Sequence, residues 1–213
     1  GGVVIDGGGI DRAVEILPGA RVTLAGVTLQ RGDPGDSADG GGAAVGLTGV
    51  LTLTHSRVIS NTALRGAGIK VLGRLNLRGV EVAANQGGGI SNDGGLLSLE
   101  AVQIHANGGA GIRNENAGVL TFNGGTVAGN QSSGVYNNAS SATLTRLVIS
   151  GNGGGVVNIG AGTRPAWLAV SGCTVMSNSA TNGAGIFSQG IGARASILNS
   201  DIRGNSATSA GGG

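Results

Sequence analysis

The chain has 213 residues with 46 Gly and 3 Pro, and Trp, Tyr and Phe together supply 2%, which excludes a core of aromatic side chains. Hydrophobic residues still reach 39%, too many for a disordered Gly-rich linker, so the composition predicts a folded chain with an aliphatic core. The net charge is +2 without clustered cations, and no apolar run approaches the roughly 18 residues of a membrane span. We therefore expect neither a nucleic-acid partner nor membrane insertion.

The chain opens with the segment GGVVID, which reads as a β-strand with Val3 and Ile5 on one side. This start lacks the charged and apolar regions of a signal peptide, so we expect the sequence to begin inside a mature protein. The last residues, GNSATSAGGG, stop where another strand is due. We therefore expect residues 1–213 to be one segment of a longer array, or to stack on neighbouring molecules through exposed ends that carry Val3, Ile5 and Ile202.

The first long loop, GDPGDSADGGGAA, is acidic. It carries Asp33, Asp36 and Asp39 at intervals of three residues. Converging carboxylates would suit Ca²⁺, so these three residues are the candidate metal ligands. The favoured interpretation is a polar turn with solvated carboxylates, and we predict no cofactor.

A repeat runs through the rest of the chain. It is anchored on the Asn that closes a V/I-x-x-N step, with Gly32 in the equivalent place of the first repeat. The interval varies from 22 residues (Asn85 to Asn107) to 29 residues (Gly32 to Asn61). The anchor residues are Asn61, Asn85, Asn107, Asn130, Asn152, Asn178 and Asn205.

Three apolar columns accompany the anchors. Eight residues before the anchor stand Leu24, Leu53, Leu77, Leu99, Phe122, Leu144, Val170 and Ile197. Three residues before it stand Leu29, Val58, Val82, Ile104, Val127, Ile149, Val175 and Ile202. After it, a G-I/V step supplies Val45, Ile69, Ile90, Ile112, Val135, Val156 and Ile186, with Ile16 as the counterpart in the first repeat.

Within each repeat, apolar and polar residues alternate with the period of two that a half-buried strand has. A unit of three such short strands cannot bury its own apolar face, so successive units must stack strand upon strand at about 4.8 Å. The sequence therefore predicts an all-β solenoid, a parallel β-helix of about eight coils with three short strands each.

The anchor Asn has a physical role in this arrangement. Asn tolerates the left-handed backbone of a sharp turn, and its amide can bond to the equivalent Asn one coil above and below. We therefore predict a structural Asn ladder. A second, shorter ladder is expected at Asn92, Asn114, Asn137 and Asn158.

Other polar residues invite a chemical interpretation but fit a structural one better. Arg57 and Glu81 share one outward column, and Arg78 and Glu100 share another, so each pair is expected to be a solvated ion pair between adjacent coils. His55 and His105 fall in different columns and do not stack. The single cysteine, Cys173, lies in an inward column and is expected to be buried. We therefore predict no catalytic residue.

A late insertion, NIGAGTRPAWL, carries Arg164, Pro165 and Trp167, which is the only Trp of the chain. An exposed Trp beside an Arg could stack on a sugar ring, so Arg164 and Trp167 are the possible ligand contacts. The alternative is that Trp167 covers a widened coil, which is the favoured interpretation.

The units GGGISNDGGLLSLEAVQIHAN and GAGIRNENAGVLTFNGGTVAGN resemble the repeats of bacterial surface β-helix proteins, including chlamydial polymorphic outer membrane proteins and pectate-lyase-like surface repeats. The opening IDGGGIDRAVEILPGARVTLAGVTLQRG resembles the segment that often precedes such arrays, so the resemblance covers nearly the whole chain. It implies a right-handed, single-stranded parallel β-helix on a secreted or surface-attached protein.

Two functions remain open. The first is a non-enzymatic extracellular or cell-surface module that is structural or adhesive, with neighbouring coils and surface glycans as partners. The second is a carbohydrate-binding or polysaccharide-cleaving β-helix, for which Trp167 and the acidic loop are the best residues. Polysaccharide-cleaving enzymes share this fold, so the fold does not distinguish the two functions, and the residues of the site must do so.

Overall fold

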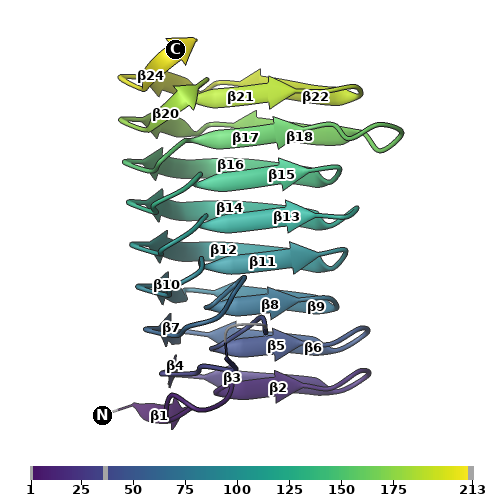
Figure 1. The fold of residues 1–213 in the computed structure, drawn as a ribbon, viewed down its shortest axis with the longest axis vertical. Helices are drawn as coiled ribbons and strands as arrows, with labels where there is room; N and C mark the ends of the chain where they lie inside the picture. Colours follow the sequence, from purple (N-terminus) through teal and green to yellow (C-terminus); the bar gives the residue numbers. More distant parts are fainter. Residues whose placement is uncertain (1, 36–37, 211–213) are drawn as a thin grey trace.

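A computed structural model describes residues 2–35 and 38–210 of the chain, and every regular element within them is a β-strand. The strands stack in register and parallel into a column of eight coils, with the two ends of the chain at opposite ends of the column (Figure 1). The prediction of an all-β solenoid of about eight coils is therefore confirmed. No helix that could cross a membrane occurs in the described part of the chain.

Each coil contributes strands to three faces. Face C is an eight-stranded sheet formed by β2 (Val14–Ile16), β5 (Ala43–Val45), β8 (Ile69–Val71), β11 (Ile90–Asp93), β13 (Ile112–Glu115), β15 (Val135–Asn138), β17 (Val156–Ile159) and β21 (Ile186–Gln189). Face A follows in the chain and contains β3 (Arg21–Ala25), β6 (Val50–Thr54), β9 (Arg74–Arg78), β18 (Ala166–Ser171) and β22 (Ala193–Leu198).

Face B comes next and contains β1 (Val3–Asp6), β4 (Val27–Gln30), β7 (Arg57–Ile59), β10 (Glu81–Ala83), β19 (Thr174–Met176) and β23 (Asp201–Arg203). In the three middle coils the strands of faces A and B merge into β12 (Leu96–His105), β14 (Val119–Ala128) and β16 (Ser141–Ser150). A small extra sheet is formed by β20 (Ser179–Asn182) and β24 (Ser206–Ala210).

The core is aliphatic and continuous. The columns eight and three residues before the anchor point inward, and their members in the middle coils, such as Leu99 and Ile104, are at most 2% exposed. Members in the terminal coils are less covered, since Ile197 is 42% exposed and Ile202 is half-buried. Val3 and Ile5 keep the predicted register, pairing with Val27 and Leu29 in the next coil.

The register on face C differs from the prediction in the early coils. Ile69 pairs with Ala43, while Val45 pairs with Val71, so Val45 lies two residues away from the column in which it was expected. Ile16 pairs with Val45, as expected, and therefore shares the shift. The G-I/V step misleads in these coils because Ala43 is small yet fully buried and takes the inward position.

The sharp turns also differ from the prediction, because the anchor Asn residues do not adopt the left-handed backbone. The residue just before the anchor does so instead; these are Arg31, Ser60, Ala84, Ala106, Gly129, Gly151, Ser177 and Gly204. A second left-handed corner lies six residues before the anchor and bends face A into face B; it contains Gly26, His55, Gly79, Ala101, Gly124, Arg146, Gly172 and Asn199. About half of these residues are Gly, which adopts this conformation without steric cost.

Candidate functional site

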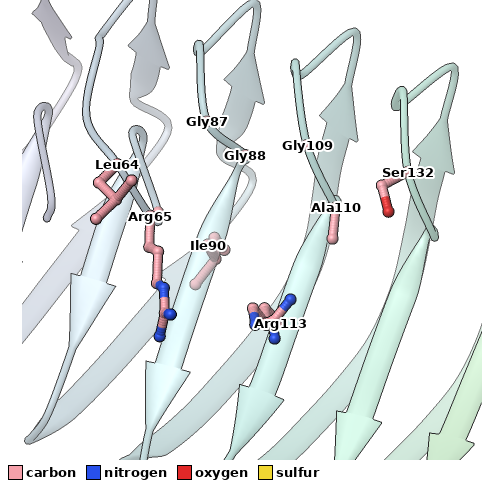
Figure 2. Close-up of a pocket in the computed structure, with 10 residues that line it drawn as sticks. Leu64, Arg65, Gly87, Gly88, Ile90, Gly109, Ala110, Arg113 and Ser132 are labelled. Carbon is pink, nitrogen blue, oxygen red and sulfur yellow. The ribbon is translucent and has the colours of Figure 1, made fainter. Parts of the chain in front are cut away.

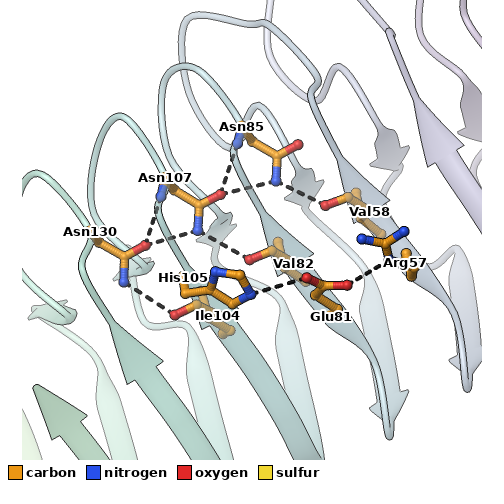
Figure 3. A network of polar contacts seen from close by, with 9 residues as sticks. All are labelled: Arg57, Val58, Glu81, Val82, Asn85, Ile104, His105, Asn107 and Asn130. Carbon is orange, nitrogen blue, oxygen red and sulfur yellow. Dashed lines mark hydrogen bonds and ion pairs between the residues drawn. The ribbon is translucent and has the colours of Figure 1, made fainter.

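The anchor ladder is a continuous line of buried amides. Asn107 shows the pattern, since its Oδ1 accepts hydrogen bonds from the backbone N–H and the Nδ2 of Asn85 at 3.1 and 3.0 Å. Its own Nδ2 donates to Val82 O at 3.2 Å and to Asn130 Oδ1 at 2.8 Å (Figure 3). The same bonds recur from Asn61 to Asn178, so the ladder prediction is confirmed. These amides are used in holding the coils together.

The ladder ends at Gly32 for a steric reason. The N–H of Gly32 donates to Asn61 Oδ1 at 2.9 Å, so the backbone replaces the missing amide. A Cβ atom at this position would collide with the carbonyl oxygen of Gly41, and no Asn side chain fits there.

The second ladder on face C is shorter. Asn92 donates to Asn114, Asn114 to Asn137 and Asn137 to Asn158, with Nδ2 to Oδ1 distances of 2.7 to 2.8 Å. Asn158 donates to Ser188 Oγ at 3.2 Å, which ends the ladder on the C-terminal side.

On the N-terminal side, the neighbour of Asn92 is Val71, which has no side-chain donor to offer. Asn92 Oδ1 is consequently one of two buried side-chain oxygens in the described residues without a hydrogen-bond partner, the other being Asn138 Oδ1. The ladder thus ends in an unsatisfied acceptor.

A charged cluster lies on the outer side of face B. Glu81 Oε2 lies 2.6 Å from Arg57 Nε, and Glu81 Oε1 lies 3.1 Å from His105 Nε2 (Figure 3). The hydrogen bond from Arg57 holds the pKa of Glu81 below its ordinary value, against the opposing effect of partial burial. Because the carboxylate faces a guanidinium, it is stabilised as the anion and is a poor proton donor. The expected pair of Arg78 and Glu100 also forms, at 3.7 Å.

The acidic loop does not gather its described carboxylates. Asp33 caps its own turn by accepting from the N–H of Gly35 at 3.0 Å. Asp39 instead pairs with Lys70 at 3.1 Å, and Lys70 also reaches Asp93 at 3.2 Å. Asp36 lies outside the described residues, so a Ca²⁺ site formed with it stays a hypothesis. Within the described part of the chain, no three His, Cys, Asp or Glu side chains are grouped to hold a metal ion.

A depression of about 290 Å³ lies beside face C, lined by Arg65, Arg113, Ile90 and several backbone segments of glycine. Figure 2 shows the two guanidinium groups on the same side of this depression, with Ile90 between them. The side chain of Arg113 is already engaged, because it forms two hydrogen bonds with Glu115 at 2.6 and 2.8 Å and covers the ring of Tyr136 at 4.6 Å. The charge of Arg113 is therefore already compensated by Glu115.

The insertion before face A forms a more open groove of about 510 Å³. Its lining includes Arg164, Pro165 and Trp167 from the insertion, and Asn116, Ala117, Ala139, Ser140 and Ser141 from the two preceding coils. Trp167 is 49% exposed and lies in β18 between Ser141 and Arg194 of the adjacent coils. The structure therefore brings the two candidate contacts, Arg164 and Trp167, into one groove.

Arg194 is a contact that the sequence analysis missed. Its guanidinium lies over the indole of Trp167, 5.0 Å from the ring centroid. The signal was available, because Arg194 and Trp167 both stand eleven residues before an anchor, which places them in one outward column. Cys173, by contrast, lies where it was expected and is 2% exposed.

Comparison with protein families gives one result for this architecture. A model of the right-handed beta helix region matches residues 41–207, well over half of the chain. The chain belongs to the right-handed β-helix family. Comparison with curated proteins and with solved structures gives no match. Membership in the right-handed β-helix family settles the fold, and the function has to be argued from the surface.

Proposed function

We propose that this right-handed β-helix is a non-enzymatic extracellular module, a rigid scaffold that serves in adhesion by presenting its lateral faces to a ligand. The observation that supports this proposal best is the anchor ladder. The polar residue that recurs in almost every coil is buried and bonded on both sides, so the repeated chemistry of the chain serves the scaffold.

The charged surface supports the same proposal. Glu81 and Glu100 face cations on adjacent coils, in the pairs Arg57 with Glu81 and Arg78 with Glu100. On face C, Asp93 and Glu115 are register neighbours, but each has a cation of its own, Lys70 and Arg113 respectively. Cleavage of a glycosidic bond by general acid and base needs one carboxyl group held protonated and a second one nearby. The lowered pKa of Glu81 works against that requirement.

The test is a paired binding and cleavage assay on the same polysaccharides. The chain is incubated with a panel of immobilised neutral and acidic polysaccharides, and bound protein and released oligosaccharides are both measured. We expect binding without release of fragments. Depolymerisation of any member of the panel would contradict the proposal and favour the enzymatic alternative.

A carbohydrate-binding role is the second candidate, and the groove beside Trp167 favours it. Carbohydrate sites commonly place an exposed aromatic ring beside hydrogen-bonding groups, because the ring covers the apolar face of a sugar while the polar groups bond its hydroxyls. The groove offers both kinds of group.

A further inference from the structure

We propose that the groove beside Trp167 binds an acidic saccharide, a sugar that carries a carboxylate or a sulfate group. The proposal rests on the adhesive function above and names its ligand class. It is carried by three observations, namely the shape of the groove, the exposed indole and the unpaired positive charge around it.

The shape comes from a loop that projects beyond its neighbours. The turn after β17 extends farther from the column than the turns of the coils beneath it (Figure 1). Reciprocal backbone hydrogen bonds between Ala161 and Arg164, at 3.1 and 3.0 Å, close this turn into a small hairpin. The shorter turns of the two preceding coils contribute Ala117 and Ala139, which line the groove of about 510 Å³ together with Pro165.

The indole of Trp167 lies between this groove and a second depression of about 210 Å³ on face A. Trp167 is 49% exposed, so much of a large apolar ring beside the guanidinium of Arg194 stays open to a ligand. The neighbouring outward residues Ser141, Thr143 and Ser196 carry hydroxyls with no hydrogen-bond partner in the described structure. An apolar ring next to open hydroxyls suits a ligand that is apolar on one face and polar at its edges, as a pyranose is.

The charge around the indole decides which saccharide fits. Arg164 lines the groove and Arg194 lines the second depression, and neither makes an ion pair within the described part of the chain. By contrast Arg57, Arg78 and Arg113 each have a carboxylate partner. Among the residues that the structure describes, no carboxylate lines either depression.

The acidic residues beside the groove lining on the preceding coils have cations of their own. Glu115, next to Asn116 in the chain, pairs with Arg113 at 2.6 Å, and Asp93, which accepts from Asn116 at 2.7 Å, pairs with Lys70 at 3.2 Å. Among the described residues, the guanidinium groups of Arg164 and Arg194 are therefore the charges beside the indole that have no ion-pair partner. Guanidinium groups bind carboxylate and sulfate oxygens with paired hydrogen bonds, which gives the preference for an acidic sugar over a neutral one.

The only Trp of the chain makes the test specific to this site, because intrinsic Trp fluorescence reports on Trp167 alone. The probes are a uronic-acid oligosaccharide, its methyl ester as an uncharged control of the same shape, and a sulfated oligosaccharide of similar length. We expect the two acidic probes to change the emission of Trp167 and to give binding heat in calorimetric titration. The methyl ester should bind at least about tenfold more weakly, the effect of losing one charge-assisted hydrogen bond.

Variants separate a local site from general surface charge. Arg164→Gln and Arg194→Gln should each weaken binding of the acidic probes at least about tenfold. Arg74→Gln is the matched control, because Arg74 occupies the same outward column as Arg194 on a distant coil and also has no ion-pair partner within the described residues. Its affinity should match that of the unaltered chain, and unchanged thermal unfolding should accompany all three variants.

Three results with the saccharide probes would overturn the proposal. They are equal affinity for the acid and its methyl ester, equal losses in Arg74→Gln and Arg164→Gln, and binding without a change in Trp167 emission. A single-stranded oligonucleotide that binds more tightly than the acidic saccharides would overturn it as well. Any of these results, combined with binding of the chain to another polysaccharide without cleavage, would leave the adhesive function standing, whereas cleavage would remove that function.

Discussion

The two Asn ladders use the same side chain in the same fold and differ in how they end. The anchor ladder begins at Gly32, whose backbone N–H bonds to Asn61 Oδ1 and leaves this acceptor satisfied. The ladder on face C begins at Asn92, next to Val71, and Asn92 Oδ1 has no hydrogen-bond partner in the part of the chain that the structure describes. Each inner amide of a buried ladder is satisfied by its neighbours. The free-energy cost of an unsatisfied polar group therefore falls on the residue at the end of the ladder.

The largest expected effect on stability comes from a substitution in the inward apolar column eight residues before the anchor. Leu99→Asp should destabilise the chain by about 4 kcal/mol or more, because it buries a carboxylate among aliphatic side chains without a partner. Leu96→Asp is the matched control in the same strand, since Leu96 is 40% exposed and its variant should cost about 1 kcal/mol or less. Thermal unfolding measures both. Equal melting temperatures would show that the assignment of the inward column is wrong.

The next effect breaks the anchor ladder in its middle. Asn107→Ala removes four hydrogen bonds of the side chain and leaves the buried backbone N–H of Asn85 without its acceptor. We expect a loss of about 2 to 4 kcal/mol in the free energy of unfolding, measured by denaturant titration. A loss below about 1 kcal/mol would mean that the ladder contributes little beyond filling space.

A third prediction compares the end of the face C ladder with its interior. Asn92→Val extends the aliphatic column by one coil at the cost of the bonds from Asn92 Nδ2 to Asn114 Oδ1 and Gly95 O, and it moves the unsatisfied acceptor from Asn92 Oδ1 to Asn114 Oδ1. Asn114→Val interrupts the ladder and breaks its bonds on both sides. Asn92→Val should therefore be the more stable variant by about 1 kcal/mol or more in denaturant titration. Asn114→Val leaves two acceptors without these donors, Asn92 Oδ1 and Asn137 Oδ1, so the reverse order would mean that an additional unpaired acceptor costs the fold little.

The smallest expected effect concerns the exposed cluster around Glu81. Glu81→Gln should change stability by a few tenths of a kcal/mol, because ion pairs at the surface are screened by water. The pKa of Glu81 is lowered in the folded chain, so the contribution of the pair is present above the ordinary pKa of Glu and is lost as the pH falls through the lowered value. Melting temperatures of the unaltered chain and the variant should therefore converge in acid. A gap that widens in acid would contradict this sign.

Much of the architecture follows from pattern alone. The alternation around Leu99 and Ile104 predicts their burial, and the recurrence of Asn at one place in each repeat predicts the anchor ladder. The pattern did not predict which residues adopt the left-handed backbone conformation at the turns. Gly recurs at Gly79 and Gly124, six residues before the anchor, but the same corner is occupied by His55 and Arg146, so residue type hides a backbone conformation that is common to all coils.

The sequence predicted only part of the candidate site. Arg164 and Trp167 attract attention because they stand together in an insertion, whereas Arg194 reaches the indole from the next coil, 27 residues after Trp167. The stacking of coils decides such a contact, because it depends on the loop lengths between two strands that are far apart in the chain.

The sequence by itself determined the coil, its inward columns and the amide that recurs in it, since these follow from local alternation and from a repeat that cannot bury its apolar face alone. Only the tertiary structure decided the register of Val45, the left-handed residues at each corner and the pairing of Trp167 with Arg194. The reason is that these features are set by the contact of one coil with the next, where a small side chain such as Ala43 or a longer loop shifts which residues meet.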